Sequence, residues 1–300
     1  MHDSISQPPT LSKTAAQQIR DLGAGERDLF TNDTSDEVSY AMSLRHFKAY
    51  LFASQLCSPQ SQLLDLGCGS GAGAVFLSQQ GHSVTAVDVD SELIHLLPTV
   101  WPASKINWKW YDGQILPLAN NSCDIVTSFQ VIEHVPDASL FLKEIFRVLK
   151  PKGCLVLTTP NRTLRVAPCQ RPWNRYHIHE FWPWELKRSL YKAGFRGVDL
   201  MGLHGTHPLV KAERRRTIAA MTRPCKQAVK RAIKPIWLAL PESSRNLLRR
   251  FYGTTNQNVP SASTQRKESP TPTEFSPNIF EWKKRGLLWS LDLLAVARKE

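Results

Sequence analysis

Residues 63–71 read Leu-Leu-Asp-Leu-Gly-Cys-Gly-Ser-Gly, a short apolar run that ends in an acid and continues into alternate glycines. Because Gly67, Gly69 and Gly71 lack a Cβ, the backbone can turn sharply there and a ligand can lie against bare peptide. Residues 72–80 then follow a helical pattern. The stretch predicts a strand, a turn and a helix, with a nucleotide-like cofactor on the turn. Taken alone, it is equally consistent with glycines that serve packing only.

A second predicted strand also ends in an acid. Residues 83–88, Ser-Val-Thr-Ala-Val-Asp, place Asp88 about 20 residues beyond the glycine turn. A carboxylate at this position can accept hydrogen bonds from both hydroxyls of a ribose. The pattern Gly67-x-Gly69-x-x-Ala72 also fits a dinucleotide fingerprint. Two classes of cofactor therefore remain open at this point.

Three further motifs follow in order. Residues 107–111, Asn-Trp-Lys-Trp-Tyr, predict a third strand and are followed by Asp112 and Gly113. Residues 123–129, Cys-Asp-Ile-Val-Thr-Ser-Phe, predict a fourth strand, which leads into a loop that begins with Gln130 and contains His134. The turn Leu-Lys-Pro-Lys-Gly at residues 149–153 precedes a fifth strand. Each motif alone is weakly specific, but the ordered series is strongly specific.

The ordered series resembles the class I S-adenosylmethionine-dependent methyltransferases, most closely the branch that methylates small molecules, ubiquinone precursors and sugars. In that family the first acid stands near the methionine end of the cofactor, the second binds the ribose, and the Asp-Gly pair faces the adenine. Lys152 departs from the family's LKPGG turn, because it replaces one glycine. The resemblance implies S-adenosyl-L-methionine as the cofactor and cofactor-binding positions at Asp65, Gly67, Cys68, Gly69, Asp88, Val89, Asp112, Gly113 and Gln130.

Alternating strands and helices predict an α/β fold with a doubly wound, mostly parallel sheet, whose ligands bind at the carboxyl ends of the strands. The resemblance implies a Rossmann-like sheet of seven strands, with an antiparallel last strand near residues 287–297. The basic residues before this strand predict a helical insertion. The expected organisation is a disordered tail at 1–35, a methyltransferase core at 36–204 plus 286–300, the insertion at 205–253 and a largely disordered linker at 254–285.

The net charge of +12 is concentrated in the predicted insertion. Residues 211–250 contain twelve Lys and Arg and two Glu, a net charge of +10. Within this segment, residues 226–240 alternate apolar and basic side chains at helical spacing and include Trp237. Such a segment can lie on an anionic membrane surface, whereas packing on the core with a charged outer face is the alternative.

Cysteine usage and hydropathy argue against a disulfide-rich, metal-binding or membrane-spanning protein. Six cysteines are scattered without a C-x-x-C pair, which favours reduced thiols and offers no metal-binding spacing. The amino-terminal residues lack the pattern of a secretory signal, and no apolar run reaches the roughly 20 residues that cross a bilayer. We therefore expect a cytoplasmic protein, with peripheral contact to an anionic membrane as the alternative.

Three histidines are candidate general bases. Methyl transfer needs a base only where the acceptor must lose a proton, and for a hydroxyl acceptor histidine is the usual candidate. His134 follows the fourth strand, and His177 and His179 lie in Tyr-His-Ile-His-Glu-Phe. Bonding of His134 to a backbone carbonyl is an equal alternative. For the other two, hydrogen bonding or a lid function is favoured over metal ligation, because the sequence places no third ligand; no metal site is predicted.

The sequence therefore predicts methyl transfer to a small-molecule, sugar-linked or lipid-linked acceptor, most simply at oxygen. An RNA methyltransferase that uses the basic insertion is one alternative, although the insertion has no recognisable RNA-binding motif and nucleic acid is not the expected partner. A non-catalytic scaffold that binds the cofactor is the other. Against it stand the acids and glycines of the predicted donor site, which a scaffold need not keep.

Overall fold

The computed structural model describes residues 9–22, 37–165, 172, 174–205 and 280–300. The predicted basic insertion and most of the predicted linker lie outside the described residues. The membrane contact inferred from residues 226–240 therefore stays a prediction.

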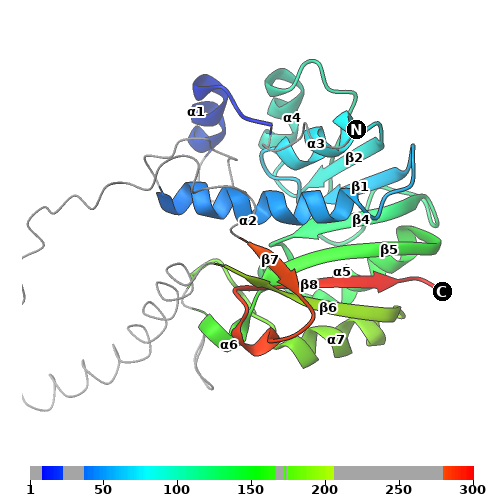
Figure 1. Cartoon of the computed structure of the whole chain (residues 1–300). Coiled ribbons are helices and arrows are strands. Elements are labelled where there is room, and N and C mark those ends of the chain that lie inside the picture. Colours follow the sequence, from blue (N-terminus) through cyan, green and yellow to red (C-terminus); the bar gives the residue numbers. More distant parts are fainter. Residues whose placement is uncertain (1–8, 23–36, 166–171, 173, 206–279) are drawn as a thin grey trace, which may run out of the picture.

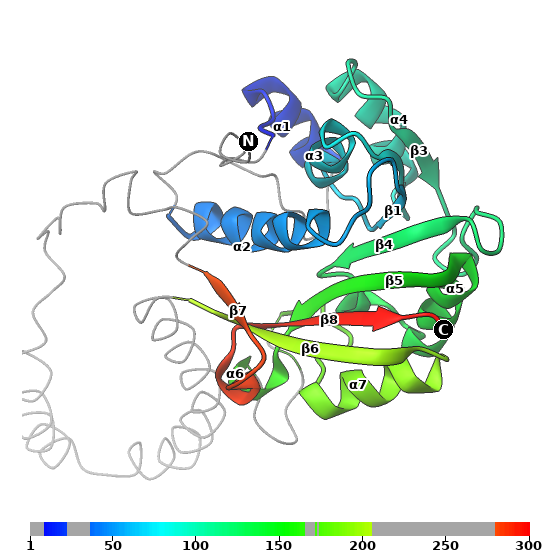
Figure 2. The same ribbon diagram turned by 45° about the vertical axis from the view of Figure 1, so that its right-hand side comes forward.

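Eight strands form one sheet in the order β3-β2-β1-β4-β5-β8-β6-β7. The first five strands of this order pair in parallel, whereas β8 is antiparallel to both β5 and β6, between which it lies (Figure 2). The predicted mostly parallel sheet with an antiparallel last strand is confirmed. The short edge strand β7 was not predicted; its residues fall in the segment expected to be a linker. The strands are β1 Gln62–Leu66, β2 Ser83–Asp88, β3 Asn107–Trp110, β4 Cys123–Phe129, β5 Leu149–Pro160, β6 Arg196–His204, β7 Glu281–Lys283 and β8 Asp292–Arg298.

Helices cover both faces of the sheet because neighbouring strand residues point to opposite sides. Leu63 of β1 packs into a core with α2, α3 and α4, whereas Leu64 packs into a second core with α5 and α7. Figure 1 shows α2 lying across the near face of the sheet. The helices are α1 Lys13–Asp21, α2 Glu37–Ser54, α3 Ala72–Gln79, α4 Ser91–Val100, α5 Ala138–Val148, α6 Arg162–Arg165 and α7 Pro183–Lys192, with short 3-10 turns η1 Ile132–His134 and η4 Leu287–Trp289.

Helix α1 corrects the prediction of a disordered tail over residues 1–35. Ser12 caps the helix by accepting a hydrogen bond from the Ala15 amide at 3.1 Å. Ile19 is fully buried and belongs to the same core as α2, α3 and α4. The polar composition of the segment concealed this helix, because only its Ala15 and Ile19 are buried.

Strands β6 and β7 meet where the chain leaves and returns to the sheet. His204 pairs with Glu281, and a Cβ on Gly205 would lie 3.1 Å from Cε1 of Phe280. Residues 206–279 therefore connect two neighbouring positions on one sheet edge.

A buried ion pair fixes α2 to the sheet. The guanidinium of Arg45 donates to the carboxylate of Asp292, the first residue of β8, with Nη2 2.6 Å from Oδ1. Both side chains are almost completely buried. The pair therefore joins α2 to β8, although 247 residues separate Arg45 from Asp292 in the sequence.

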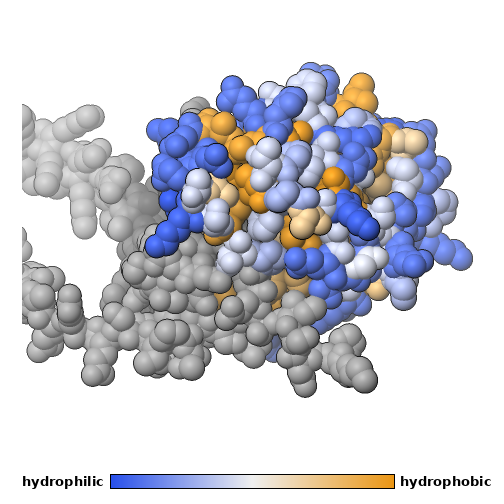
Figure 3. Space-filling view, turned by 90° about the horizontal axis from the view of Figure 1, so that it is seen from above, coloured by the Kyte–Doolittle hydropathy of each residue, from blue (hydrophilic) through white to orange (hydrophobic). Residues whose placement is uncertain are grey.

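The described surface mixes polar and apolar side chains. In the view of Figure 3, apolar residues lie between polar ones rather than forming one continuous apolar face. Within the described ranges, we find no helix with the length and apolar character that a bilayer crossing requires.

Candidate active site

A cavity of about 460 Å³ opens at the carboxyl ends of β1, β2 and β4. This is the edge at which ligands of doubly wound sheets bind. Its wall combines the glycine turn after β1, the start of α4, the loop after β4 and one side of α2. The lining residues are Met42, His46, Tyr50, Gly67, Cys68, Gly69, Ser70, Asp88, Val89, Asp90, Leu93, Tyr111, Phe129, Gln130, Val131, Glu133, His134, Arg165, Tyr176 and His177.

The glycine turn presents its backbone to this cavity. Gly67 has a φ of 77° and its amide donates to the Val87 carbonyl at 2.7 Å; a Cβ there would lie 2.4 Å from Cγ2 of Val131. Gly69 has a φ of 50°, and a Cβ there would meet nothing within 4 Å. Gly67 is thus required by packing, whereas Gly69 borders open space that a ligand can fill. Burial raises the pKa of the Cys68 thiol well above its usual range, so this side chain stays protonated and serves packing.

Asp88 ties the glycine turn to the start of α4. Its carboxylate accepts hydrogen bonds from the Gly69 amide at 3.0 Å and the Asp90 amide at 3.1 Å. Burial raises the pKa of this carboxyl, and these backbone donors oppose the shift. Val89 and Asp90 also line the cavity, and Asp90 caps α4 through the Leu93 amide. The structure therefore places the predicted ribose-binding acid at the cavity wall.

Asp65 lies behind the cavity wall instead of in it. Its carboxylate accepts hydrogen bonds from the Tyr50 hydroxyl at 3.1 Å and from Oγ1 of Thr127 at 2.8 Å. Burial raises the pKa of Asp65 to about 7, although both hydrogen bonds oppose the shift. Tyr50 lines the cavity. Asp65 is therefore connected to the cavity through its hydrogen bond with the Tyr50 hydroxyl.

Asp112 and Gly113 are not among the cavity residues. The Asp112 carboxylate accepts hydrogen bonds from the amides of Gln114 at 2.9 Å and Ile115 at 3.0 Å, which lower the pKa of this exposed acid. Tyr111, one residue earlier, lines the cavity instead. A Cβ on Gly113 would lie 3.6 Å from Cγ1 of Val89, so the pair adjoins the cavity without facing it.

Gln130 lies at the predicted place after β4. It has a φ of 57°, its amide donates to the Thr158 carbonyl at 2.9 Å, and its Nε2 lies 3.3 Å from Oγ1 of Thr158. The following Val131 packs against Gly67. This loop therefore forms part of the cavity wall, together with the glycine turn.

His134 and His177 meet at one end of the cavity. Their ring centroids are 4.9 Å apart and the rings are nearly perpendicular. Nδ1 of His134 lies 3.0 Å from the carbonyl oxygen of Tyr176, the backbone contact that the sequence left as an alternative to catalysis. Nδ1 of His177 lies 2.7 Å from a carboxylate oxygen of Glu180. The fold thus brings together two of the three predicted histidines.

His179 belongs to a separate groove. Its Nε2 lies 2.8 Å from a carboxylate oxygen of Glu185, beside the stacked rings of Trp182 and Trp184. Although His177 and His179 are only two residues apart, their side chains line different hollows. The two side chains separate because the segment is irregular and each ring lies against the carboxylate of a different glutamate, Glu180 or Glu185, in keeping with the favoured hydrogen-bonding role.

Sequence reasoning missed two buried glutamates. Glu133 and Glu180 are both 0% exposed, and each adjoins a histidine of the cavity. Glu133 directly precedes His134, and Glu180 follows His177 by three residues. A charged residue next to a histidine at the carboxyl end of a strand was the signal that could have found Glu133.

The amino-terminal wall of the cavity comes from one face of α2. Met42, His46 and Tyr50 recur at intervals of four residues and all line it. Residues on this face of α2 can also pack against the neighbouring helix α3. Tyr50 does both, because a Cβ on Gly73 of α3 would lie 1.9 Å from its Cζ.

These residues fit S-adenosyl-L-methionine. The space beside Gly69 admits a ligand against bare backbone, and Asp88 offers a carboxylate beside it. The remaining wall is largely apolar and aromatic, with Leu93, Tyr111 and Phe129, as a ligand with a flat base requires. The cavity therefore has the features of a donor site for a nucleoside-containing cofactor.

Comparison with known proteins agrees with this geometry. Residues 64–157 match the family model described as a methyltransferase domain. A relative in Mycobacterium tuberculosis H37Rv, named a probable S-adenosylmethionine-dependent methyltransferase, is 33% identical over 205 residues, which are 68% of this chain and 72% of that protein. The chain belongs to the S-adenosylmethionine-dependent methyltransferases, so the predicted enzyme class and cofactor are confirmed.

Further relatives share shorter segments. A relative in Mycolicibacterium smegmatis with the same description is 33% identical over 162 residues, and the chain covers 62% of its length. A ubiquinone biosynthesis O-methyltransferase of Coxiella burnetii is 29% identical over 168 residues, which are 52% of this chain and 71% of that protein. An S-adenosylmethionine-dependent methyltransferase structure from Thermotoga maritima has a TM-score of 0.51 and 16% identity, covers 89% of this chain and 96% of its own, and shares the fold.

Proposed function

We propose that this enzyme methylates a hydroxyl group of a small-molecule, sugar-linked or lipid-linked acceptor. The observation that carries the proposal is the pair of imidazoles, His134 and His177, at one end of the donor cavity. The relative in Coxiella burnetii, which is named an O-methyltransferase, supports oxygen as the accepting atom. No described feature of the cavity favours RNA as the acceptor.

The glycine turn, Asp88 and the apolar wall at Leu93 and Phe129 would hold the methyl donor. Bound there, S-adenosylmethionine supplies a methyl carbon on a positively charged sulfur, and transfer to oxygen breaks the carbon–sulfur bond while its electron pair stays on sulfur. The protein's part is then to orient the acceptor. Tyr50, held by Asp65, fixes the wall between the two ends.

The acceptor hydroxyl must lose its proton during transfer. We propose that His134 and His177 promote this loss, because both rings are fixed through Nδ1 and both line the cavity. Glu180 acts as a positioning residue, since it orients the His177 ring from a fully buried site. Arg165, buried at the same cavity, adds a positive charge that suits an acceptor with an anionic group.

Product profiling tests this function. The purified enzyme is incubated with methyl-labelled donor and fractionated small-molecule and lipid extracts, and the labelled products are identified by mass spectrometry. We expect an O-methyl ether whose formation falls about 100-fold or more in His177→Ala, because positioned proton removal contributes about that much. S-adenosylhomocysteine should bind this variant normally. Label found in RNA, or on nitrogen alone, would contradict the proposal.

A further inference from the structure

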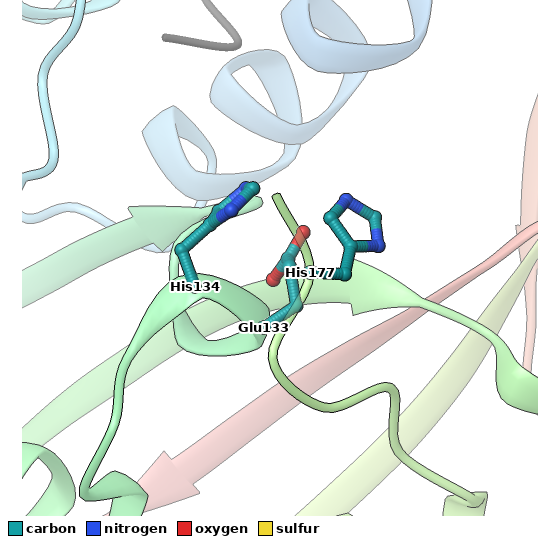
Figure 4. Close-up of side chains that lie close together, drawn as sticks. All are labelled: Glu133, His134 and His177. Carbon is teal, nitrogen blue, oxygen red and sulfur yellow. The ribbon is translucent and has the colours of Figure 1, made fainter. Parts of the chain in front are cut away.

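Three side chains that can ligate a metal meet at the end of the cavity that we assign to the acceptor. One ligand atom each of Glu133, His134 and His177 lies within 4.8 Å of the other two. Glu133 and His134 belong to η1, whereas His177 lies in the segment before α7, so tertiary folding brings them together. Figure 4 shows the Glu133 carboxylate lying between the two imidazole rings.

The hydrogen bonds of both imidazoles fix the tautomer that binds metals. Nδ1 of His134 points to the Tyr176 carbonyl, and Nδ1 of His177 points to the Glu180 carboxylate. Because these acceptors hold the proton on Nδ1, the lone pair lies on Nε2 in both rings. Pairing of a ligand histidine with an outer carboxylate or carbonyl is the usual support of a metal site.

Glu133 supplies an unsatisfied carboxylate oxygen at the centre of the cluster. Its Oε2 accepts a hydrogen bond from Oγ1 of Thr159 at 3.0 Å, whereas Oε1 has no hydrogen-bond partner among the described residues. The side chain is fully buried, and burial raises the pKa of Glu133 to about 7. A buried acceptor without a partner costs free energy, and a cation beside it would remove that cost.

We propose that Glu133, His134 and His177 bind a divalent transition-metal cation of the zinc or iron(II) class. Two imidazoles and one carboxylate suit such cations, whereas Mg²⁺ prefers oxygen ligands alone. Because all three residues line the cavity, a cation that they hold would be accessible to an acceptor bound in it. Nε2 of His177 now lies 2.9 Å from Nδ2 of Asn174, so cation binding displaces that amide.

The role of the cation rests on the proposed function, whereas the binding site does not. An acceptor hydroxyl that coordinates the cation has a lowered pKa, as water does on zinc. The hydroxyl then ionises and its proton passes to water in the open cavity. The two histidines thus promote proton loss through the cation, and Glu180 positions one of them.

Cobalt titration tests the site directly. The full chain, stripped with a chelator and dialysed, is titrated with Co²⁺ and the visible absorption is recorded, followed by competition with Zn²⁺. We expect one tightly bound Co²⁺, displaced by Zn²⁺, without the sulfur-to-metal absorption of a cysteine site. Glu133→Gln, His134→Asn and His177→Asn should each weaken binding at least about tenfold, since each removes one ligand. His95→Asn, at an exposed position on α4, is the matched control and should bind normally.

Calorimetry with S-adenosylhomocysteine checks that each variant retains the donor site, and variants that lose it are replaced by Glu133→Ala or His177→Gln. Absence of Co²⁺ binding to the parent protein, equal binding by the three ligand variants, or a cobalt–thiolate band would overturn the site. The catalytic role is tested separately by the rate of O-methylation with and without Zn²⁺. An unchanged rate in metal-free enzyme would refute the catalytic role of the cation but not the proposed function. Cation binding without any methylation of a hydroxyl would refute the proposed function but not the metal site.

Discussion

At the scale of single residues, the two glycines at the start of the turn after β1 have separable roles. Both have a positive φ, but a Cβ meets Val131 at Gly67 and open space at Gly69. We expect Gly67→Ala to lower the free energy of unfolding by about 2–4 kcal/mol, because strain and overpacking add. Gly69→Ala should cost only about 1–2 kcal/mol from strain, yet weaken S-adenosylmethionine binding at least about tenfold.

Urea unfolding and calorimetry on this matched pair measure both effects. Equal loss of stability in the two variants would contradict the separate packing role of Gly67. Unchanged cofactor affinity in Gly69→Ala would show that the open space beside Gly69 is not the donor site.

The raised pKa of the buried Asp65 carboxyl should make the stability of the protein depend on pH. Burial raises the pKa of Asp65 in the folded protein to about 7, against an ordinary value of 3.8, so between these limits the unfolded chain releases a proton that the folded protein retains. Stability should therefore fall as pH rises from about 4 to about 7, by an amount on the order of 4 kcal/mol. Asp65→Asn removes this contribution and should flatten the profile. The shifted pKa values of Asp88 and Glu133 leave part of the slope in place.

Urea midpoints measured across this pH range check the prediction. A parallel decline in the parent protein and in Asp65→Asn would place the buried proton elsewhere.

At the scale of elements, the ion pair between α2 and β8 is the most vulnerable contact. Arg45→Met leaves the Asp292 carboxylate buried without its guanidinium partner. We expect a loss of about 3–5 kcal/mol of unfolding free energy, because an uncompensated buried charge is costly. Adding Asp292→Leu should recover most of the loss, since well-packed apolar residues often replace a buried pair.

A double-mutant cycle by urea unfolding measures the coupling. Additive losses in the double variant would mean that the two side chains contribute independently.

Strands β2 and β4 could be predicted because each is a run of strand-forming residues bounded by turn residues. The predicted ranges 83–88 and 123–129 match these two strands. Helix α1 was missed because burial of Ala15 and Ile19 depends on a partner that lies far along the chain. The site could likewise be predicted only in part. Asp88 could be predicted from its position at the end of a strand, whereas the proximity of Glu133 and His177 depends on tertiary folding.

At the scale of the whole molecule, β6 and β7 pair directly where the chain leaves and re-enters the sheet, and this predicts that the sheet can form without residues 206–279. We expect a variant in which a short Asn-Gly turn joins Gly205 to Phe280 to fold and to bind S-adenosylmethionine, because the two ends already lie together. Its melting temperature should change by a few degrees at most, roughly the effect of 1 kcal/mol. Circular dichroism and calorimetry test this, with an intact chain of the same preparation as the control. An insoluble product, or one without donor binding, would show that these residues complete the core.

Helix α2 has a further consequence for how the two substrates communicate. Its Tyr50 is held by a hydrogen bond to Asp65, and His46 and Met42 continue the same wall one and two turns earlier. We expect a ligand that shifts this helix at one position to shift the cavity wall along its length. Donor and acceptor binding would then be coupled, and the factor by which one ligand changes the affinity of the other would be the same in both directions.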